Sequence, residues 1–181
     1  ALQLPSEPLR WSGTSPAALW VSPDQWLLID EVRSVEQLIG YCDAALGEIL
    51  HNATDSSDAL TCMTVEGVGA RGLLAMFSGV DCDAGRFAPG QCVRTRMAKV
   101  AVLVRAMIDD RFELFVDRSV GPYLEQWLHR AAHDPKLSTL GTIEITAKLV
   151  DTGGEFPPND LYDYAHVMNC LLYTSPSPRD S

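Results

Sequence analysis

The sequence lacks the features of membrane-spanning and nucleic-acid-coating proteins. Its apolar runs are far shorter than the roughly 20 residues needed to cross a bilayer as a helix. Its 14 basic residues are outnumbered by 24 acidic ones, for a formal net charge of −10. Coating nucleic acid or an anionic membrane requires clustered positive charge, of which this chain has little. We therefore expect neither nucleic acid nor a membrane among its partners.

Cysteine pairs of the kind that hold zinc or exchange disulfides are also absent. The five cysteines are odd in number and widely spaced, and no two form a Cys-x-x-Cys pair. The first residues do not show the basic and apolar segments of a signal peptide. These observations predict reduced, mostly buried thiols and a cytoplasmic protein.

Residues able to carry catalysis or bind a metal are not arranged for either role. Cys82 lies between Asp81 and Asp83, whose charges disfavour a thiolate. His129 and His133 are four residues apart, which can place two imidazoles on one metal, but no cysteine or carboxylate stands at ligand spacing beside them. We interpret both histidines as favourable partners for a helix C-terminus. No catalytic, metal-binding or cofactor-binding residue is assigned.

Gly67, Gly69 and Gly72 form a G-x-G-x-x-G pattern between a predicted strand and a predicted helix. Such a pattern binds a dinucleotide when it opens a parallel strand–helix–strand unit with an acidic residue about 20 positions further on. Here the helix is short, Asp81 and Asp83 come early, and a Pro-Gly turn follows. A tight strand-to-helix turn is therefore favoured over a dinucleotide site.

Local patterns predict an α+β fold with amphipathic helices packed on a mainly antiparallel sheet. Ser34 and Gln37 make a capping box, after which apolar residues recur at helical spacing. Runs of alternating or β-branched residues predict strands separated by turns. The expected elements are a hairpin turning at 22–25, a helix over 34–50, a polar turn over 51–58, a strand at 60–67, a short helix over 69–79, a three-stranded meander over 91–116 and a last helix capped by Ser119.

The chain divides into two parts by composition. Residues 1–134 hold these elements and are predicted to form one domain. Residues 135–181 hold a possible strand at 142–150, a turn-rich stretch and a Ser/Pro ending, and form an unassigned tail. Residues 171–181 resemble a translated sequencing adapter and are excluded from the fold prediction.

One stretch departs from the acidic character of the chain. Residues 86–105 contain no acidic residue and five basic ones, Arg86, Arg94, Arg96, Lys99 and Arg105. Because side chains alternate along a strand, Arg94 and Arg96 should project from the same face. The five residues form either a solvated face of the sheet or a docking surface for an acidic patch on a partner.

Three stretches resemble the sarcosine oxidase gamma subunit family in order and approximate spacing. Residues 1–30 have a Leu-Pro connector, Leu-Trp, a Ser-Pro-Asp turn and Trp-Leu-Leu. Residues 65–97 have Gly-x-x-Ala-Arg-x-Leu-Leu, an Asp-centred loop, Phe-x-Pro-Gly and Arg-Thr-Arg, and residues 112–132 have Phe-Glu-Leu, Arg-Ser and a Trp-Leu helix. A more distant similarity is to the folate-binding domain of the glycine-cleavage aminomethyltransferase.

The resemblance implies a non-catalytic subunit with no cofactor of its own, truncated at its N-terminus. In the parent complex it implies an alpha subunit that binds NAD and tetrahydrofolate, a beta subunit that binds FAD and FMN, and a delta subunit that binds zinc. That assembly oxidatively demethylates sarcosine to glycine. Two alternatives stay open: a free-standing folate-binding protein of the aminomethyltransferase type, and the corresponding subunit of N-methylglutamate dehydrogenase.

Overall fold

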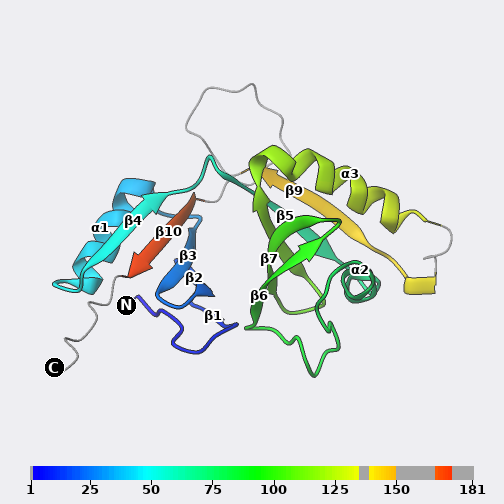
Figure 1. Cartoon of the computed structure of the whole chain (residues 1–181), viewed down its shortest axis with the longest axis horizontal. Coiled ribbons are helices and arrows are strands. Elements are labelled where there is room, and N and C mark those ends of the chain that lie inside the picture. Colours follow the sequence, from blue (N-terminus) through cyan, green and yellow to red (C-terminus); the bar gives the residue numbers. More distant parts are fainter. Residues whose placement is uncertain (1, 135–138, 150–165, 173–181) are drawn as a thin grey trace, which may run out of the picture.

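A computed structural model of the chain describes residues 2–134, 139–149 and 166–172 (Figure 1). Within these residues the strands form two five-stranded sheets, ordered β1-β2-β3-β10-β4 and β6-β7-β8-β5-β9, and all pairings are antiparallel. The predicted α+β class is confirmed. The strands build two sheets, however, where the sequence patterns suggested one.

The first sheet contains β1 (Trp11–Ser12), β2 (Ala17–Ser22), β3 (Gln25–Asp30), β4 (His51–Asp55) and β10 (His166–Leu172). The second contains β5 (Leu60–Glu66), β6 (Cys92–Met97), β7 (Val100–Ala106), β8 (Phe112–Asp117) and β9 (Glu144–Leu149). The helices are α1 (Val35–Leu46), α2 (Ala70–Phe77), the short 3-10 helix η1 (Arg118–Val120) and α3 (Gly121–Ala132).

These elements stack in layers that bring the two sheets face to face (Figure 1). Helix α1 packs on the outer face of the first sheet through a cluster that includes Leu28, Leu38 and Cys42. Helices α2 and α3 cover the outer face of the second sheet, where the largest core cluster lies. A third cluster, including Leu19 and Phe115, joins the inner faces of the two sheets. Burial of apolar side chains on both faces of each sheet therefore holds the fold together.

Helix α1 begins where its sequence predicts and ends earlier. The Ser34 hydroxyl accepts from the Gln37 backbone N–H, and the Gln37 side chain accepts from the Ser34 N–H, so the capping box is confirmed. The helix ends at Leu46, four residues before the predicted Leu50, because Gly47 adopts a positive φ of 58°. Glycine takes this left-handed conformation without the steric penalty of a Cβ atom.

Strands β4 and β10 were not expected from the sequence. Residues 51–55 of the expected polar turn form β4, which pairs with β10 over His51 to Asp55. Asn and Asp have low strand propensity, so backbone pairing with β10 outweighs local preference here. The predicted strand at 142–150 is confirmed as β9. Thus the stretch that was expected to be a tail supplies β9 to the second sheet and β10 to the first. The division of the chain into a domain over 1–134 and a tail over 135–181 stays a prediction.

The meander and the last helix are confirmed, with a difference in the cap. Strands β6, β7 and β8 follow one another in the second sheet, as predicted. The predicted cap, Ser119, lies inside η1, and the Asp117 carboxylate accepts from the Ser119 N–H at 2.8 Å. A carboxylate is at least as good an N-cap as a hydroxyl, so Asp117, two residues earlier, caps η1, which leads directly into α3.

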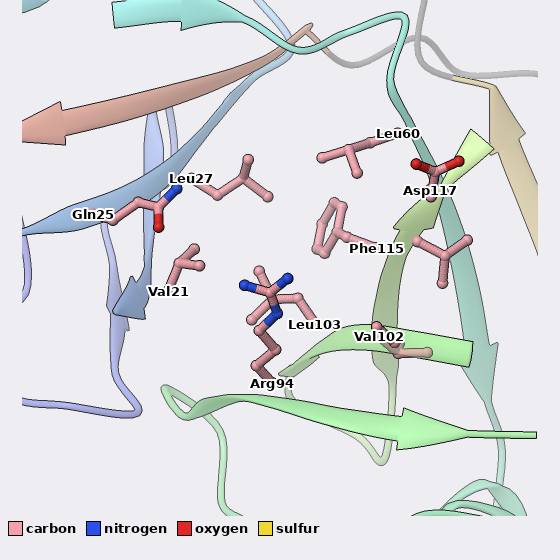
Figure 2. A pocket seen from close by; sticks show the side chains of 11 residues that line it. Val21, Gln25, Leu27, Leu60, Arg94, Val102, Leu103, Phe115 and Asp117 are labelled. Carbon is pink, nitrogen blue, oxygen red and sulfur yellow. The ribbon is translucent and has the colours of Figure 1, made fainter. Parts of the chain in front are cut away.

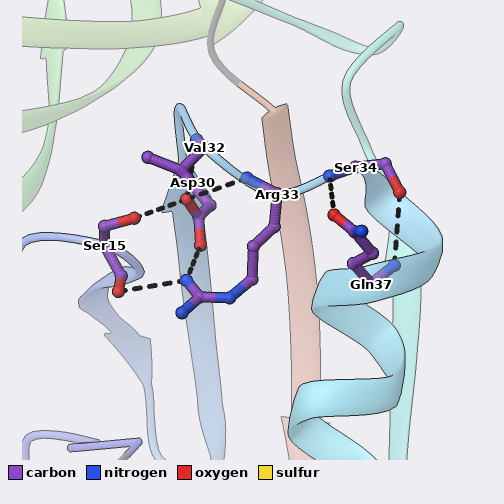
Figure 3. A network of polar contacts seen from close by, with 6 residues as sticks. All are labelled: Ser15, Asp30, Val32, Arg33, Ser34 and Gln37. Atoms are coloured by element: carbon purple, nitrogen blue, oxygen red, sulfur yellow. Dashed lines mark hydrogen bonds and ion pairs between the residues drawn. The ribbon is translucent and has the colours of Figure 1, made fainter.

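The junction between β3 and α1 is organised by a buried carboxylate (Figure 3). Asp30 is fully buried and accepts hydrogen bonds from the Ser15 hydroxyl at 2.6 Å and the Val32 N–H at 2.9 Å. It also accepts from the Arg33 guanidinium, which in turn donates to the Ser15 carbonyl at 3.1 Å. Burial by itself would raise the pKa of Asp30, but these hydrogen bonds outweigh it and lower the pKa below its usual value.

We expect Asp30→Asn to lower the free energy of unfolding by about 1–3 kcal/mol at pH 7, because the amide cannot accept all the bonds that the carboxylate accepts. A lowered folded-state pKa stabilises the fold above the unfolded-state pKa of about 3.9, and this contribution disappears as the pH falls through the folded-state value. Urea unfolding of both proteins between pH 7 and pH 2.5 should therefore show a difference that shrinks at the acid end. A difference that stays constant with pH would contradict this account.

Candidate partner interface

The β6–β7 hairpin carries three exposed basic side chains. Along β6, Val93, Thr95 and buried Met97 face the core covered by the helices, so Arg94 and Arg96 project from the opposite face. Ala98 and Lys99 form the turn with positive φ values of 49° and 72°, as in the two-residue turns whose twist matches a hairpin. The strand period and the turn thus place Arg94, Arg96 and Lys99, hereafter the basic hairpin, on one accessible edge.

The other two predicted interface residues lie elsewhere. Arg86 is exposed in the loop between α2 and β6, and its Nε lies 3.9 Å from the Asp81 carboxylate. Arg105 is only 7% exposed and donates from Nη2 to Glu113, its direct neighbour across β7 and β8. The Trp11 ring lies 4.9 Å from its guanidinium carbon. The sequence run of positive charge therefore contains one buried structural arginine, which does not belong to an accessible docking surface.

The charged groups of the basic hairpin are not neutralised by other side chains of the described residues. In the part of the chain that the structure describes, Arg94, Arg96 and Lys99 form no ion pair, and no hydrogen bond of their side chains is found. A guanidinium without an internal partner is available to a carboxylate, which it can bind through two parallel hydrogen bonds.

A recess opens beside Arg94, between the two sheets, and it is called the apolar recess here because most of the residues that line it are apolar. Its volume is about 280 Å³. Figure 2 shows the Arg94 guanidinium extending toward Val21, Leu103 and Phe115. Gln25 lies at the first-sheet side, and Asp117, on the other side, is engaged as the cap of η1, where hydrogen bonds from Ser119 lower its pKa. The recess can accept an apolar group whose neighbouring carboxylate reaches Arg94.

The recess could not be identified from local sequence patterns. Val21 and Leu27 come from the β2–β3 hairpin, Leu60 from the start of β5, and Leu103 and Phe115 from the meander. Strand alternation predicts that these side chains leave each strand on its apolar face. It does not specify that the apolar faces of two separate sheets meet, which is a property of the tertiary structure.

Burial and hydrogen bonding describe the surroundings of Cys82, Cys92 and His133. Burial is the largest cause that raises the pKa of the Cys82 thiol, and burial raises that of Cys92 to about 11. Both therefore stay protonated near neutral pH. His133 Nδ1 lies 2.8 Å from the His129 carbonyl, which fits the predicted role at the end of α3. Among the described residues, no three His, Cys, Asp or Glu side chains are grouped as a metal site.

The glycine pattern after β5 has a packing explanation. A Cβ atom on Gly67 would lie 2.5 Å from the Thr142 carbonyl oxygen, and one on Gly72 would lie 2.7 Å from the Leu140 side chain. The Gly69 N–H donates to Thr142 O at 3.0 Å. The segment that leads into β9 therefore occupies the space against the start of α2, and the glycines permit its close approach. This arrangement supports the tight turn that the sequence favoured.

None of the described helices is both long and apolar enough to span a bilayer. The fold and the surface together define an α+β protein of two facing antiparallel sheets, with a basic hairpin that is unpaired among the described residues and lies beside an apolar recess. The family model described as sarcosine oxidase, gamma subunit family, matches residues 2–134, and the chain belongs to that family. The predicted family resemblance is thereby confirmed.

Two solved structures are similar to the chain in fold to different degrees. A chain of the heterotetrameric sarcosine oxidase from Corynebacterium sp. U-96, solved in complex with pyrrole 2-carboxylate, is 23% identical with a TM-score of 0.67. That match covers 78% of this chain and 70% of the other. Glycine cleavage system aminomethyltransferase T from Bartonella henselae is 14% identical, with a TM-score of 0.47 and coverage of 67% and 42%. No curated protein sequence matches the chain.

Proposed function

We propose that this chain is a non-catalytic gamma subunit of a heterotetrameric sarcosine oxidase, and that it supports the oxidative demethylation of sarcosine to glycine by binding to subunits that carry the flavins. The observation that carries the docking role is the unpaired basic hairpin beside an apolar recess. FAD, FMN, NAD, tetrahydrofolate and zinc would reside in the alpha, beta and delta partners, and this chain would hold none of them.

The composition of the surface favours a protein partner. Interfaces that bind proteins combine apolar anchors with arginine, and complementary charge sets their register. A recess of about 280 Å³ lies just below the range of about 300–1,000 Å³ for small-molecule pockets and suits one or two side chains. This size favours the docking role over the alternative of a free-standing folate-binding protein. Discrimination between sarcosine and another N-methyl amino acid would rest with the partners.

We place the complex in the cytoplasm. Among the described residues, Cys82 and Cys92 are buried thiols that form no disulfide. Free buried thiols are typical of proteins in a reducing compartment, where structural disulfides are rare.

Reversing both strand charges tests the docking role. We expect Arg94→Glu with Arg96→Glu to lower the affinity for the co-expressed partner subunits at least about tenfold, because like charges would then meet across the interface. Pull-down of the tagged chain, followed by titration of the isolated components, measures the loss. Arg130→Glu reverses an exposed arginine on α3 and serves as the control, with little expected effect. Full recovery of the complex with the double variant would overturn the proposal.

A further inference from the structure

Strand β6 forms one edge of the second sheet. It pairs with β7 along its whole length, and no strand lies on its other side within the described residues. Figure 1 shows β6 at the border of that sheet. An edge strand has backbone N–H and C=O groups that point away from the sheet, and these can pair with a strand from another chain.

Only the ends of this free edge are occupied. At one end, the Cys92 N–H donates to the Leu9 carbonyl at 3.0 Å, beside an isolated bridge between Arg10 and Gln91. At the other end, Met97 forms an isolated bridge with Ser78. Between them the edge is open over the centre of β6.

The direction of the Arg94 backbone follows from Cys92. In an antiparallel ladder, residues two apart direct their N–H and C=O groups to the same side. Because the Cys92 N–H points away from β7, the Arg94 N–H and C=O do so as well. Among the described residues, Arg94 makes no backbone hydrogen bond with any segment on that side.

A shallow groove follows this open edge. It is lined by Gly79, Arg94, Thr95, Arg96 and Ala101. Thr95 and Arg94 project from opposite faces of β6, so a groove that touches both side chains runs along the edge between the faces. Gly79 has no side chain to fill it: a Cβ atom there would still lie 3.9 Å from Thr95 Oγ1.

We propose that β6 accepts a short, extended, acidic segment of a partner subunit as an added strand. The backbone of Arg94 supplies the hydrogen bonds, and Arg94, Arg96 and Lys99 select acidic side chains at alternate positions of the incoming strand. This inference rests on the proposed function, since it specifies how the basic hairpin binds its partner.

A second copy of this chain is a poor occupant of the same edge. Pairing β6 with β6 of another copy would bring Arg94 and Arg96 close to their own counterparts, and like charges on adjacent strands repel. Charged edge strands prevent self-association in this way. The segment 86–105 contains no acidic residue that would relieve the repulsion. The charge pattern thus excludes a copy and favours an acidic strand of different sequence.

The test compares Arg94→Pro with Arg94→Ala in the full chain, co-expressed with the partner subunits. Both variants lack the guanidinium, but only proline also lacks the N–H that points outward. The β6–β7 ladder does not use that N–H, so both variants should fold, with equal urea midpoints. We expect Arg94→Pro to bind the partners about tenfold more weakly than Arg94→Ala. Equal affinities for the two variants, with the wild-type chain binding normally, would overturn strand addition and leave the proposed function intact.

Hydrogen exchange of the wild-type complex provides a second measurement that does not depend on a variant. Strand addition should slow exchange of the Arg94 amide at least about tenfold on complex formation. An unchanged Arg94 amide in a formed complex would refute the added strand. Protection that arises in the isolated chain and increases with its concentration would identify a second copy as the occupant and also refute it. If the wild-type chain fails to bind any partner, the proposed function falls, and strand addition falls with it.

Discussion

Replacing Glu113 with alanine is expected to lower the free energy of unfolding by about 3–5 kcal/mol, the range for removing one member of a buried ion pair. The side chains of Glu113 and Arg105 are 11% and 9% exposed. Arg105 donates to Glu113 and packs against the ring of Trp11, and its own Nε has no hydrogen-bond partner in the described residues. Without Glu113, a guanidinium would remain in a low-dielectric environment with its principal counter-charge removed.

Replacing both Arg105 and Glu113 should change the free energy of unfolding less than replacing Glu113 alone. Arg105→Met alone leaves the Glu113 carboxylate with Arg111, 3.6 Å away, and should cost less than Glu113→Ala. The double change Arg105→Met with Glu113→Leu replaces both charges by apolar groups, which is often close to neutral because no charge is then desolvated. Urea unfolding of the three variants gives the coupling energy as a double-mutant cycle. Additive losses in the double variant would contradict a buried, mutually dependent pair.

The Arg105 pair illustrates the limit of the sequence prediction. Arg94, Arg96 and Arg105 occupy the same acid-free stretch and have the same chemistry, so composition alone groups them. What separates them is register: Arg105 lies on β7 opposite Glu113, in the interior of the sheet, whereas the other two lie on an edge strand. Strand order is determined by contacts between distant segments, and a local pattern carries no information about it.

Elements with strong local signals were predictable. The capping box at Ser34 and the helix after Asp117 depend on residues within a few positions of one another, and the meander depends on short turns between consecutive strands. Strand β4 had no such signal, since its polar residues become a strand only by pairing with β10, more than 100 positions away. The apolar recess depends in the same way on two sheets meeting. Local sequence signals therefore predicted most helices and strands, whereas the apolar recess depends on pairing and packing between distant segments.

Arg71 is the side chain on α2 that fixes the loop leading to β6. Its Nη1 donates to the carbonyls of Cys82 and Phe87 at 2.7 and 2.8 Å, and its Nε donates to Asp110 at 2.9 Å. The guanidinium also lies 5.1 Å from the centre of the Phe112 ring. One planar group thus joins α2, the α2–β6 loop and the β7–β8 turn, an arrangement that the several donors of arginine permit.

We expect Arg71→Ala to lower the free energy of unfolding by about 3 kcal/mol, because three charge-assisted hydrogen bonds are lost and two loop carbonyls lose a donor. Arg71→Lys should recover little of this loss, since one ammonium cannot match the geometry of the planar fork. Asp110 is 44% exposed on its side chain, so Asp110→Asn should cost less than about 1 kcal/mol. Urea unfolding measures all three, and full rescue by lysine would show that charge alone matters.

Local hydrogen exchange separates this loop effect from a general loss of stability. The amides of Arg86 and Phe87 donate to the Asp83 carbonyl, forming a turn directly beside the carbonyls that Arg71 holds. In Arg71→Ala these amides should exchange faster by a larger factor than those of α3, because the hydrogen bonds of Arg71 go to the loop and to Asp110. Equal acceleration in both places would mean that Arg71 stabilises the domain as a whole. Because the loop continues into β6, its loosening should also weaken partner binding at the edge strand.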